Sequence, residues 1–523
     1  MPTLDWIGKK KVVNHHLDVP FKVLNKQYTF SADGKAQDSE NKIIHGDNLE
    51  ALKALLPEYE GKIKCIYIDP PYNTGNENWV YNDNVNDPRI KKWLGEVVGQ
   101  EGEDLTRHDK WLCMMYPRLK LLHKLLSDDG AIFISIDDCE YTNLKLICDE
   151  IFGISCFVAN TVWQNSIQPK GYLGSFSIQH NYTLVYSKNS EYIVGNLERT
   201  AEHNKAYKNP DNDPRGPWRS GDVRNALYRP NLIYEIISPS GKKISPPSEN
   251  GWRWSKETMA EKIRTGEIIF NKDETGIIRK IYLDTVDGRA PESIWFGEDV
   301  GTTREATTEM KDIFGGKTPF DTPKPTRLIE RILQIASEKD SIILDSFSGS
   351  GTTAHAVLNM NKRDDGNRKF ILIEMMDYAE SITAERVKRV IKGYGSDKDK
   401  VEGLGGDFSF YELGEPLLVN GLLNEKVDVS NIREYIWFTE THLKLFESQK
   451  IDNEYFLGKN HEVGYWFYYK KNEETCLNYD FLSTMKTKAD QYIIYADVCR
   501  LPASFLKEHN IVFKKIPREI QKF

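Results

Sequence analysis

The stretch IIHGDNLEALKALLPEYEGKIKCIYIDPPY, residues 43–72, decides the fold class of this 523-residue chain. IIH at 43–45 predicts a short strand, and NLEALKALLPEY at 48–59 has the apolar spacing of an amphipathic helix. KCIYI at 64–68 is a short apolar run that predicts a second, buried strand. Strand, helix and strand in this order predict an α/β fold.

The residues that directly follow the second strand, Asp69-Pro70-Pro71-Tyr72, form the first candidate site. Ligands of open α/β sheets bind at the carboxyl ends of the strands. Because proline donates no backbone hydrogen bond, nearby carbonyls stay available, and Asp69 with the Pro70 carbonyl would accept both hydrogens of an amino group. Tyr72 offers a ring face for stacking. A strand-ending turn with a capping aspartate is the alternative for this motif alone.

The second candidate site is LDSFSGSGTT at 344–353, where an apolar strand runs into a glycine-containing turn and a helix start. Gly349 and Gly351 permit close backbone approach, and the first N–H groups of the helix favour an anionic group. About 25 residues on, Glu374 ends the next predicted strand, where an acid can bind ribose hydroxyls. Dinucleotide and S-adenosylmethionine sites share this layout, so the motif alone leaves both open.

The strand–helix alternation is interrupted between the two motifs. It continues to about residue 155, through a helix at 109–126 that we expect Pro117 to interrupt, and resumes after about 320. Residues 155–256 hold 13 Lys or Arg against 8 Asp or Glu, although the whole chain carries −8. We therefore predict one α/β domain in two halves, 41–155 and 321–400, around an inserted module at 156–320. Residues 1–40 are expected to be a surface arm, and 401–523 a small mixed α/β C-terminal domain.

Composition excludes several classes of protein. The seven cysteines contain no C-x-x-C pair, so neither a disulfide framework nor a metal site is predicted. The longest apolar runs are far too short to cross a bilayer, and the first residues lack an apolar signal-peptide core. We expect a cytoplasmic protein that does not bind membranes. The acidic net charge argues against a nucleic-acid partner only on average, because the middle of the chain is locally basic.

Taken together, the two motifs resemble those of the amino-group DNA methyltransferases, and in particular the Mod subunits of type III restriction–modification systems. D-P-P-Y precedes F-x-G-x-G with the insertion between them, which is the order of the permuted β group. The resemblance extends over most of the chain, for example DKWLCMMYPRLKLLHKLLSDDGAIFISIDD (109–138), FDTPKPTRLIERILQIA (320–336) and FLSTMKTKADQYIIYADVC (481–499). It implies a Rossmann-like S-adenosylmethionine-dependent methyltransferase sheet, split by a target-recognition domain.

The resemblance also implies roles for single residues. The catalytic loop is matched by Asp69, Pro70, Pro71 and Tyr72. The S-adenosylmethionine site is matched by Asp47, Lys324, Asp345, Phe347, Gly349, Ser350, Gly351, Thr352 and Glu374, with Lys324 closing over the methionine part. Helix capping is the alternative for Asp47, and ordinary surface charge is the alternative for Lys324.

The inserted module matches the target-recognition position of the family. Among its aromatic residues lie Arg215, Arg219, Arg224 and Arg229, which we expect to contact DNA, with a solvated charged surface as the alternative. The expected partners are double-stranded DNA, a second copy of the chain in a homodimer, and an ATP-dependent Res subunit that would supply cleavage.

The implied reaction is methyl transfer from S-adenosylmethionine to the N6 amine of a flipped adenine. Methylation at a ring carbon of cytosine needs a cysteine nucleophile, typically after proline, and no cysteine here follows one. D-P-P-Y rather than S-P-P-Y favours adenine N6 over cytosine N4, which remains the alternative. A different class of function, a DNA-recognition subunit of a restriction complex with degenerate methylation, also stays open.

Overall fold

The computed structural model describes residues 3–74, 107–169, 176–246, 249–396, 399–445 and 452–518. The chain forms two compact units. The first comprises Met1–Val194 together with Glu292–Phe523, and the second comprises Gly195–Pro291. The α/β class predicted from the sequence is confirmed, with one large sheet at the centre of the first unit.

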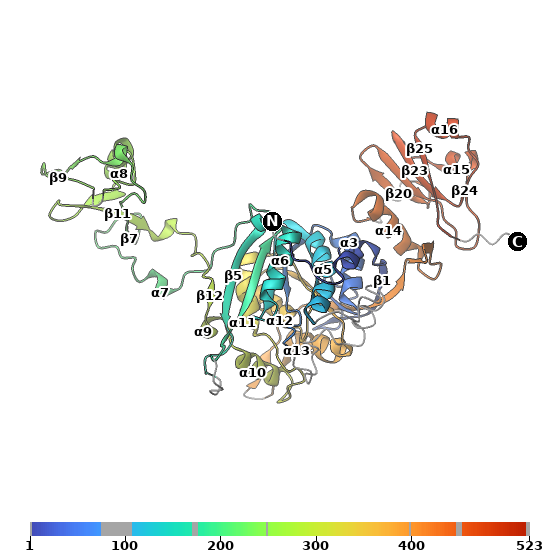
Figure 1. Ribbon diagram of the computed structural model, residues 1–523, viewed down its shortest axis with the longest axis horizontal. Helices are drawn as coiled ribbons and strands as arrows, with labels where there is room; N and C mark the ends of the chain where they lie inside the picture. Colours follow the sequence, from blue (N-terminus) through green and yellow to red (C-terminus); the bar gives the residue numbers. More distant parts are fainter. Residues whose placement is uncertain are drawn as a thin grey trace. The chain divides into compact units, whose positions relative to one another are not determined.

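The large sheet is built from strands on both sides of the insertion (Figure 1). Its order is β1 (Lys22–Ser31), β17 (Asp407–Pro416), β2 (Lys42–His45), β14 (Lys369–Glu374), β13 (Ile342–Asp345), β3 (Ile63–Ile68), β4 (Leu126–Ile136), β6 (His180–Ser187), β5 (Phe157–Gln164) and β12 (Ile294–Trp295). The strands from β17 to β4 run parallel to one another. Their near-continuous apolar sequences suit a parallel sheet that is buried on both faces.

The two halves of the domain meet at two junctions, where β2 pairs with β14 and where β3 pairs with β13. Cys65 lies opposite Ile343, and Ile66 opposite Leu344, in a parallel register. Because parallel strands end at the same edge of a sheet, the turn after β3 and the turn after β13 lie next to each other. This pairing brings together the two motifs that the insertion separates in the sequence.

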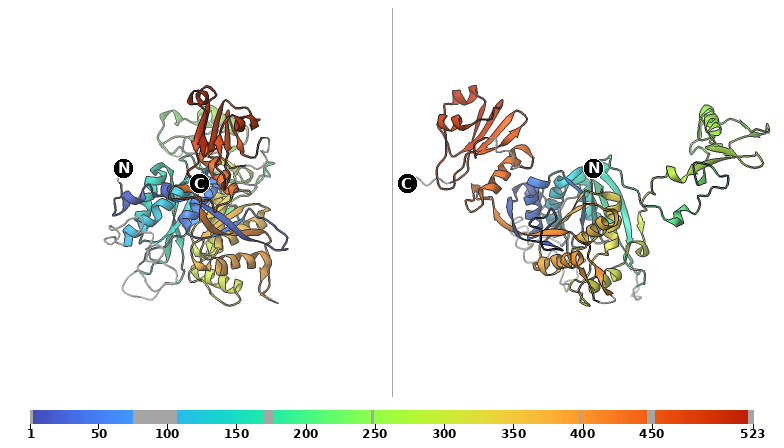
Figure 2. Two further views of the ribbon diagram at one scale, coloured as in Figure 1. Left: turned by 90° about the vertical axis from the view of Figure 1, so that its right-hand side faces the viewer. Right: turned by 180° about the vertical axis from the view of Figure 1, so that it is seen from behind.

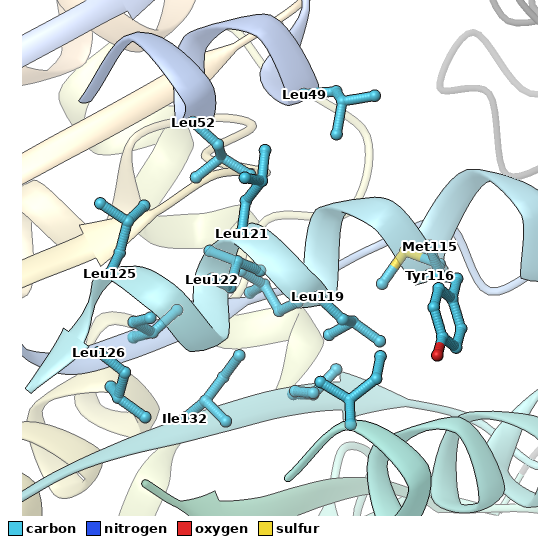
Figure 3. Packing of buried hydrophobic residues seen from close by; sticks show 14 of the residues in the cluster. Leu49, Leu52, Met115, Tyr116, Leu119, Leu121, Leu122, Leu125, Leu126 and Ile132 are labelled. Atoms are coloured by element: carbon cyan, nitrogen blue, oxygen red, sulfur yellow. The ribbon is translucent and has the colours of Figure 1, made fainter. Parts of the chain in front are cut away.

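The helices α3 (Asn48–Tyr59) and α5 (Arg107–Leu125) pack their apolar faces together beside the sheet. Figure 3 shows Leu49 and Leu52 of α3 near the leucines of α5, with Ile132 of β4 below them. Each fully buried leucine contributes about 1.5–3 kcal/mol. We expected Pro117 to interrupt this helix, but α5 is continuous through it and Pro117 is buried. A proline removes only one backbone hydrogen bond, and the packing of the buried residues of α5 stabilises the remainder of the helix.

Residues 1–40 are not the surface arm that the sequence suggested. Their polar composition conceals β1, which pairs antiparallel with β17 at the edge of the sheet. Two short helices, α1 (Lys9–Val12) and α2 (His15–Asp18), precede it. Trp6, Val12 and Val19 are buried in the main core, so this segment belongs to the α/β domain.

The inserted unit is smaller than the predicted module of 156–320. β5, β6 and β12 belong to the large sheet, where β6 pairs antiparallel with β4, and α10 (Thr303–Ile313) belongs to the first unit. The separate unit, Gly195–Pro291, has a sheet of β10 (Ile268–Phe270), β11 (Ile277–Tyr282) and β7 (Trp218–Gly221). Its core includes Met259 of α8 (Lys256–Arg264) and Trp252 of the segment before that helix.

The C-terminal part is mixed α/β, drawn in orange to red in Figure 2. Its sheet has the order β20 (Phe456–Asn460), β21 (Val463–Phe467), β23 (Gln491–Ala496) and β25 (Ile511–Lys515). The helices α14 (Val429–Thr441), α15 (Tyr479–Thr484) and α16 (Ala503–Glu508) accompany it. The predicted boundary at residue 401 cuts off β17, which is a strand of the large sheet.

None of the helices in the described ranges combines the length and the apolar character needed to cross a membrane.

Candidate active site

The candidate active site lies at the edge of the large sheet where β3 and β13 end. Asp69 follows β3, and the loop from Ser346 to Gly351 follows β13. Glu374 ends β14, the strand on the other side of β13. The structure thus brings the two predicted motifs and Glu374 to neighbouring strand ends, the position at which open α/β sheets bind ligands.

The loop Asp69–Tyr72 is fixed by hydrogen bonds within the first unit. The Tyr72 hydroxyl donates to Asp69 Oδ1 at 2.8 Å. Burial, together with the charge of Asp69, holds the pKa of Tyr72 well above its ordinary value, so the phenol stays neutral and remains a donor. The Trp111 indole of α5 donates to the Pro71 carbonyl at 2.7 Å. The Pro71 carbonyl is therefore already hydrogen-bonded. No described residue donates to the Pro70 carbonyl, so this carbonyl can accept a hydrogen bond from a ligand beside Asp69.

The glycine loop is shaped by its own aspartate. Gly349 and Gly351 have φ of +49° and +79°, the left-handed region that favours glycine. Asp345 Oδ1 accepts from the Phe347 N–H at 3.1 Å, and Oδ2 accepts from the Thr353 hydroxyl at 2.5 Å. Burial raises the pKa of Asp345 to about 7. Asp345 therefore braces the loop from inside, which is a positioning role for a residue predicted to bind the cofactor.

Glu374 links the glycine loop to the next strand. Its side chain is only 6% exposed, and each carboxylate oxygen accepts a backbone N–H, Oε2 from Gly349 at 2.8 Å and Oε1 from Met376 at 3.0 Å. Burial raises the pKa of Glu374 to about 7 against the opposing effect of these donors. The Tyr378 hydroxyl and the Met375 N–H also stabilise the ionised carboxylate, so a ribose hydroxyl would share its four lone pairs with these donors.

Lys324 lies between the two motifs. Its ammonium forms an ion pair with Asp69 Oδ2 and stands 5.2 Å from the centre of the Tyr72 ring. Its backbone carbonyl accepts from the Thr352 hydroxyl at 3.3 Å, at the start of α12 (Thr352–Asp364). The backbone of Lys324 therefore lies beside the start of α12, where the methionine part of the cofactor is expected, whereas its side chain reaches Asp69.

This arrangement coincides with the region matched by a known family. The family model described as DNA methylase matches residues 63–385, which include both motifs and the insertion. The chain belongs to the DNA methylase family. The family predicted from the sequence is confirmed, and with it the DNA methyltransferase class and S-adenosylmethionine as the cofactor of the class.

Several curated relatives of this methylase are Mod subunits. The StyLTI Mod subunit of Salmonella typhimurium is 36% identical over 71% of this chain and 57% of its own length. The EcoP15I Mod subunit of Escherichia coli is 30% identical over 80% of this chain and 73% of its own. The type II methyltransferase M.KpnI of Klebsiella pneumoniae is 34% identical over 67% and 85%. A solved structure of a putative DNA modification methylase from Thermus thermophilus aligns at 14% identity over 67% of this chain and 95% of its own, with a TM-score of 0.32.

The methylase holds Asp47 in place with residues that the sequence did not reveal. Asp47 is the N-cap of α3, since its Oδ1 accepts from Leu49 N–H at 2.8 Å. The buried Arg118 of α5 approaches Asp47 Oδ2 at 3.4 Å and donates to the Asn48 side chain. Asn48 in turn donates to the Ser346 carbonyl at 3.2 Å. Capping, the alternative interpretation of Asp47, is therefore present, and Arg118 and Asn48 link its carboxylate indirectly to the glycine loop.

A second buried arginine forms hydrogen bonds to the start of α12. Arg386 of α13 (Glu385–Lys392) donates to the hydroxyls of Ser350 at 3.1 Å and Thr352 at 2.8 Å. Its other nitrogen pairs with Glu309 at 3.1 Å. The adjacent His355 is buried, and burial with the charge of Arg386 lowers its pKa to about 4. Ser350 and Thr352 are thus held in position by an arginine far along the chain.

The residue that follows D-P-P-Y is anchored by a third set of residues absent from the prediction. Asn73 has φ of +58° and donates its amide to the fully buried Glu140. His108 and Asn143 each approach Glu140 at 2.7 Å. Asn73 follows D-P-P-Y directly, so its place in the sequence could have indicated a role beside the motif. The contribution of Glu140 is visible only in the fold.

The four arginines predicted to contact DNA differ in their surroundings within Gly195–Pro291. Arg215 binds Asp213 at 2.9 Å and the carbonyls of Thr265 and Gly266, so it holds this unit together. Arg219 donates to the Tyr207 hydroxyl at 3.0 Å. Arg224 pairs with Asp222 but is 57% exposed, and Arg229 is exposed as well.

Proposed function

We propose that this protein methylates the N6 amine of adenine at a specific duplex DNA sequence, as the modification subunit of a type III restriction–modification system. The observation that carries the proposal is the pair of acceptors, Asp69 and the Pro70 carbonyl, next to a glycine loop at adjoining strand ends. The similarity to Mod subunits over most of the chain supports the type III assignment.

The acceptors explain how a weak nucleophile would react. The lone pair of an exocyclic amine is delocalised into the base. When Asp69 and the Pro70 carbonyl accept both N–H hydrogens, electron density returns to nitrogen and its lone pair is oriented. Positioning and fixed dipoles then lower the barrier without a covalent intermediate. Tyr72, held by Asp69, would stack against a base that has left the duplex, an extrusion that costs a few kcal/mol.

The glycine loop fits S-adenosylmethionine. Among the described residues, the hydroxyls of Ser346 and Ser348 are buried without a hydrogen-bond partner, so the loop has unused polar groups. Glu374 would bind the ribose, and Gly349, Ser350, Gly351 and Thr352 would hold the methionine carboxylate at the start of α12. Asp47 and Phe347 would border the adenine. The bound cofactor supplies an electrophilic methyl group.

Adenine is the proposed target because an aspartate, rather than a serine, heads the catalytic motif. Cytosine N4 is the chemical alternative, since its exocyclic amine would fit the same two acceptors.

DNA contacts are assigned to the unit Gly195–Pro291. Arg224 and Arg229 are exposed next to Leu227 and Tyr228, which are 67% and 63% exposed, so this loop presents cations and apolar groups together. Such a combination suits phosphate contact and base-edge reading. Arg215 and Arg219 would act mainly by stabilising the unit. A homodimer and an ATP-dependent Res partner complete the proposal by analogy with type III systems.

Mapping modified bases in DNA from cells that express the protein tests the proposal. We expect N6-methyladenine at one recognition sequence, lost on Asp69→Ala. Asp129→Ala is the matched control, because Asp129 is an exposed carboxylate paired with Lys64 near the amino ends of β4 and β3, whereas the site lies at the carboxyl ends. N4-methylcytosine would replace the proposed target base. No modified base, together with specific DNA binding, would instead favour a recognition subunit.

A further inference from the structure

Lys324 occupies the place that the target amine needs. Its ammonium is bound to Asp69 Oδ2, one of the acceptors assigned to the amino group, and lies over the ring of Tyr72, the assigned stacking surface. The pair is partly buried, with side-chain exposures of 12% for Lys324 and 24% for Asp69. A cation donating N–H hydrogens to this carboxylate imitates the exocyclic amine, so base and ammonium cannot occupy the site together.

The backbone of the same lysine lies beside the place that the proposed function gives to a second anion. Its carbonyl is bound by the Thr352 hydroxyl, so its backbone is fixed beside the start of α12. The first N–H groups of that helix favour an anion, which in a methylase is the carboxylate of the cofactor. The lysine side chain is a flexible four-carbon stem, so a change of rotamer would move the ammonium from Asp69 toward this carboxylate while the backbone stays in place.

We propose that Lys324 is a positioning residue that closes the base site in the cofactor-free enzyme and opens it when the cofactor binds. In the cofactor-free state the ammonium neutralises Asp69 and covers Tyr72. In the bound state it pairs with the cofactor carboxylate, and Asp69 becomes available to the base. The inference rests on the proposed function, because it needs Asp69 as the acceptor of the target amine.

This exchange has a measurable cost for cofactor binding. If most molecules hold Lys324 on Asp69, the apparent dissociation constant is the intrinsic one divided by the fraction in which Lys324 is available. Couplings of this kind usually change affinity by about 5- to 150-fold. Reciprocity requires that the cofactor promote entry of the base by the same factor.

A double-mutant cycle on the full chain tests the inference by calorimetry without DNA. The ligand is S-adenosylhomocysteine, which lacks the sulfonium charge that would itself interact with Asp69. Asp69→Asn should bind it about tenfold more tightly than wild type, because Lys324 loses its competing partner. Lys324→Met should bind it more weakly. In the Lys324→Met background, Asp69→Asn should have no further effect.

The inference is overturned if Asp69→Asn changes the dissociation constant by the same factor, including no change, in both backgrounds. Lys324→Gln serves as a second neutral variant, and thermal unfolding checks that each protein is folded. Lys339→Met is the matched control, since Lys339 bonds a carbonyl of Asp364 and lies outside the site. Because no methylation is measured, an additive cycle refutes the switch alone, whereas loss of the proposed function would appear in the mapping of modified DNA.

Discussion

Replacing Glu374 with glutamine is expected to weaken cofactor binding and to remove its dependence on pH. In the cofactor-free protein burial raises the pKa of Glu374 to about 7. Ribose hydroxyls donate to the ionised carboxylate, which is purely an acceptor, so binding selects the deprotonated form. Affinity should therefore fall as the pH drops below about 7 and should be constant well above it.

The magnitude follows from the geometry and the pKa. At pH 6 about one molecule in ten carries the carboxylate, so the dissociation constant should be about tenfold higher than at pH 8. Glutamine keeps one acceptor oxygen but directs an NH2 group at the N–H of Gly349 or Met376, to which Glu374 now bonds at 2.8 and 3.0 Å. A hydrogen bond to a charged group contributes about 1.5–3 kcal/mol, so losing the charge that accepts from the ribose should raise the dissociation constant by about 10- to 150-fold, whereas the unsatisfied N–H is present with and without cofactor and lowers stability only.

Calorimetric titration with S-adenosylhomocysteine at pH 6, 7 and 8 measures both effects, and buffers of different ionisation enthalpy reveal proton release. Glu330→Gln is the matched control. Burial also raises the pKa of Glu330, but this residue bonds Asn359 and lies on α11 (Thr326–Ala336), outside the loop. A wild-type dissociation constant that is flat between pH 6 and 8, or a tenfold change that persists in Glu374→Gln, would refute the reasoning.

Four further outcomes are expected. Arg386→Met should lower the free energy of unfolding in urea by about 1–3 kcal/mol, because it removes a fully buried guanidinium that pairs with Glu309 and donates to the hydroxyls of Ser350 and Thr352. Arg386→Lys should recover part of the loss, and equal stability of all three proteins would contradict this. Trp111→Phe should lower kcat about tenfold in a methylation assay, with cofactor affinity unchanged, because it removes the indole donor from the catalytic loop; an unchanged kcat would show that this anchor is dispensable. The unfolding free energy of the cofactor-free protein should fall as the pH rises from about 4.5 to 7, because the folded protein favours the protonated form of a carboxyl whose pKa is raised. The fall should be about 3 kcal/mol smaller in Glu374→Gln. Equal pH dependence of the unfolding free energy in the two proteins would argue against the raised pKa. Arg224→Ala should reduce the slope of log affinity for DNA against log salt concentration by about 1 without changing the melting temperature, whereas Arg215→Ala should lower the melting temperature. The reverse result would assign DNA contact to Arg215 and stabilisation of the unit to Arg224.

The sequence was sufficient wherever a site is made from one strand and the turn after it. D-P-P-Y after KCIYI and the glycine loop after IILD are local patterns, and the parallel sheet brings them together automatically. The position of Glu374 could be predicted for the same reason, since it ends the strand beside β13.

Residues that act through long-range contacts could not be predicted in this way. Arg118, Glu140 and Arg386 look like ordinary charged positions on helices or loops, and only the fold shows that they are buried against the site. The segment 1–40 was misjudged because β1 is an edge strand with polar residues on its solvent side, which resembles a surface arm in composition. The insertion was drawn too large because β5 and β6 are antiparallel and break the rhythm of strand and helix.

The pairing of β3 with β13 sets an order of events during synthesis. Cys65 leaves the ribosome long before Ile343, its neighbour in the sheet, so β3 must wait with one edge unpaired. Gly195–Pro291 contacts mainly itself and can fold meanwhile, as domains generally do while the chain is still growing. A polypeptide truncated between Pro291 and β13 would hold D-P-P-Y and the inserted unit without the glycine loop, so such an incomplete chain could meet DNA without being able to mark it. Conversely, two fragments separated within Gly195–Pro291 would each carry strands that the other needs, and their reassembly would restore the whole sheet.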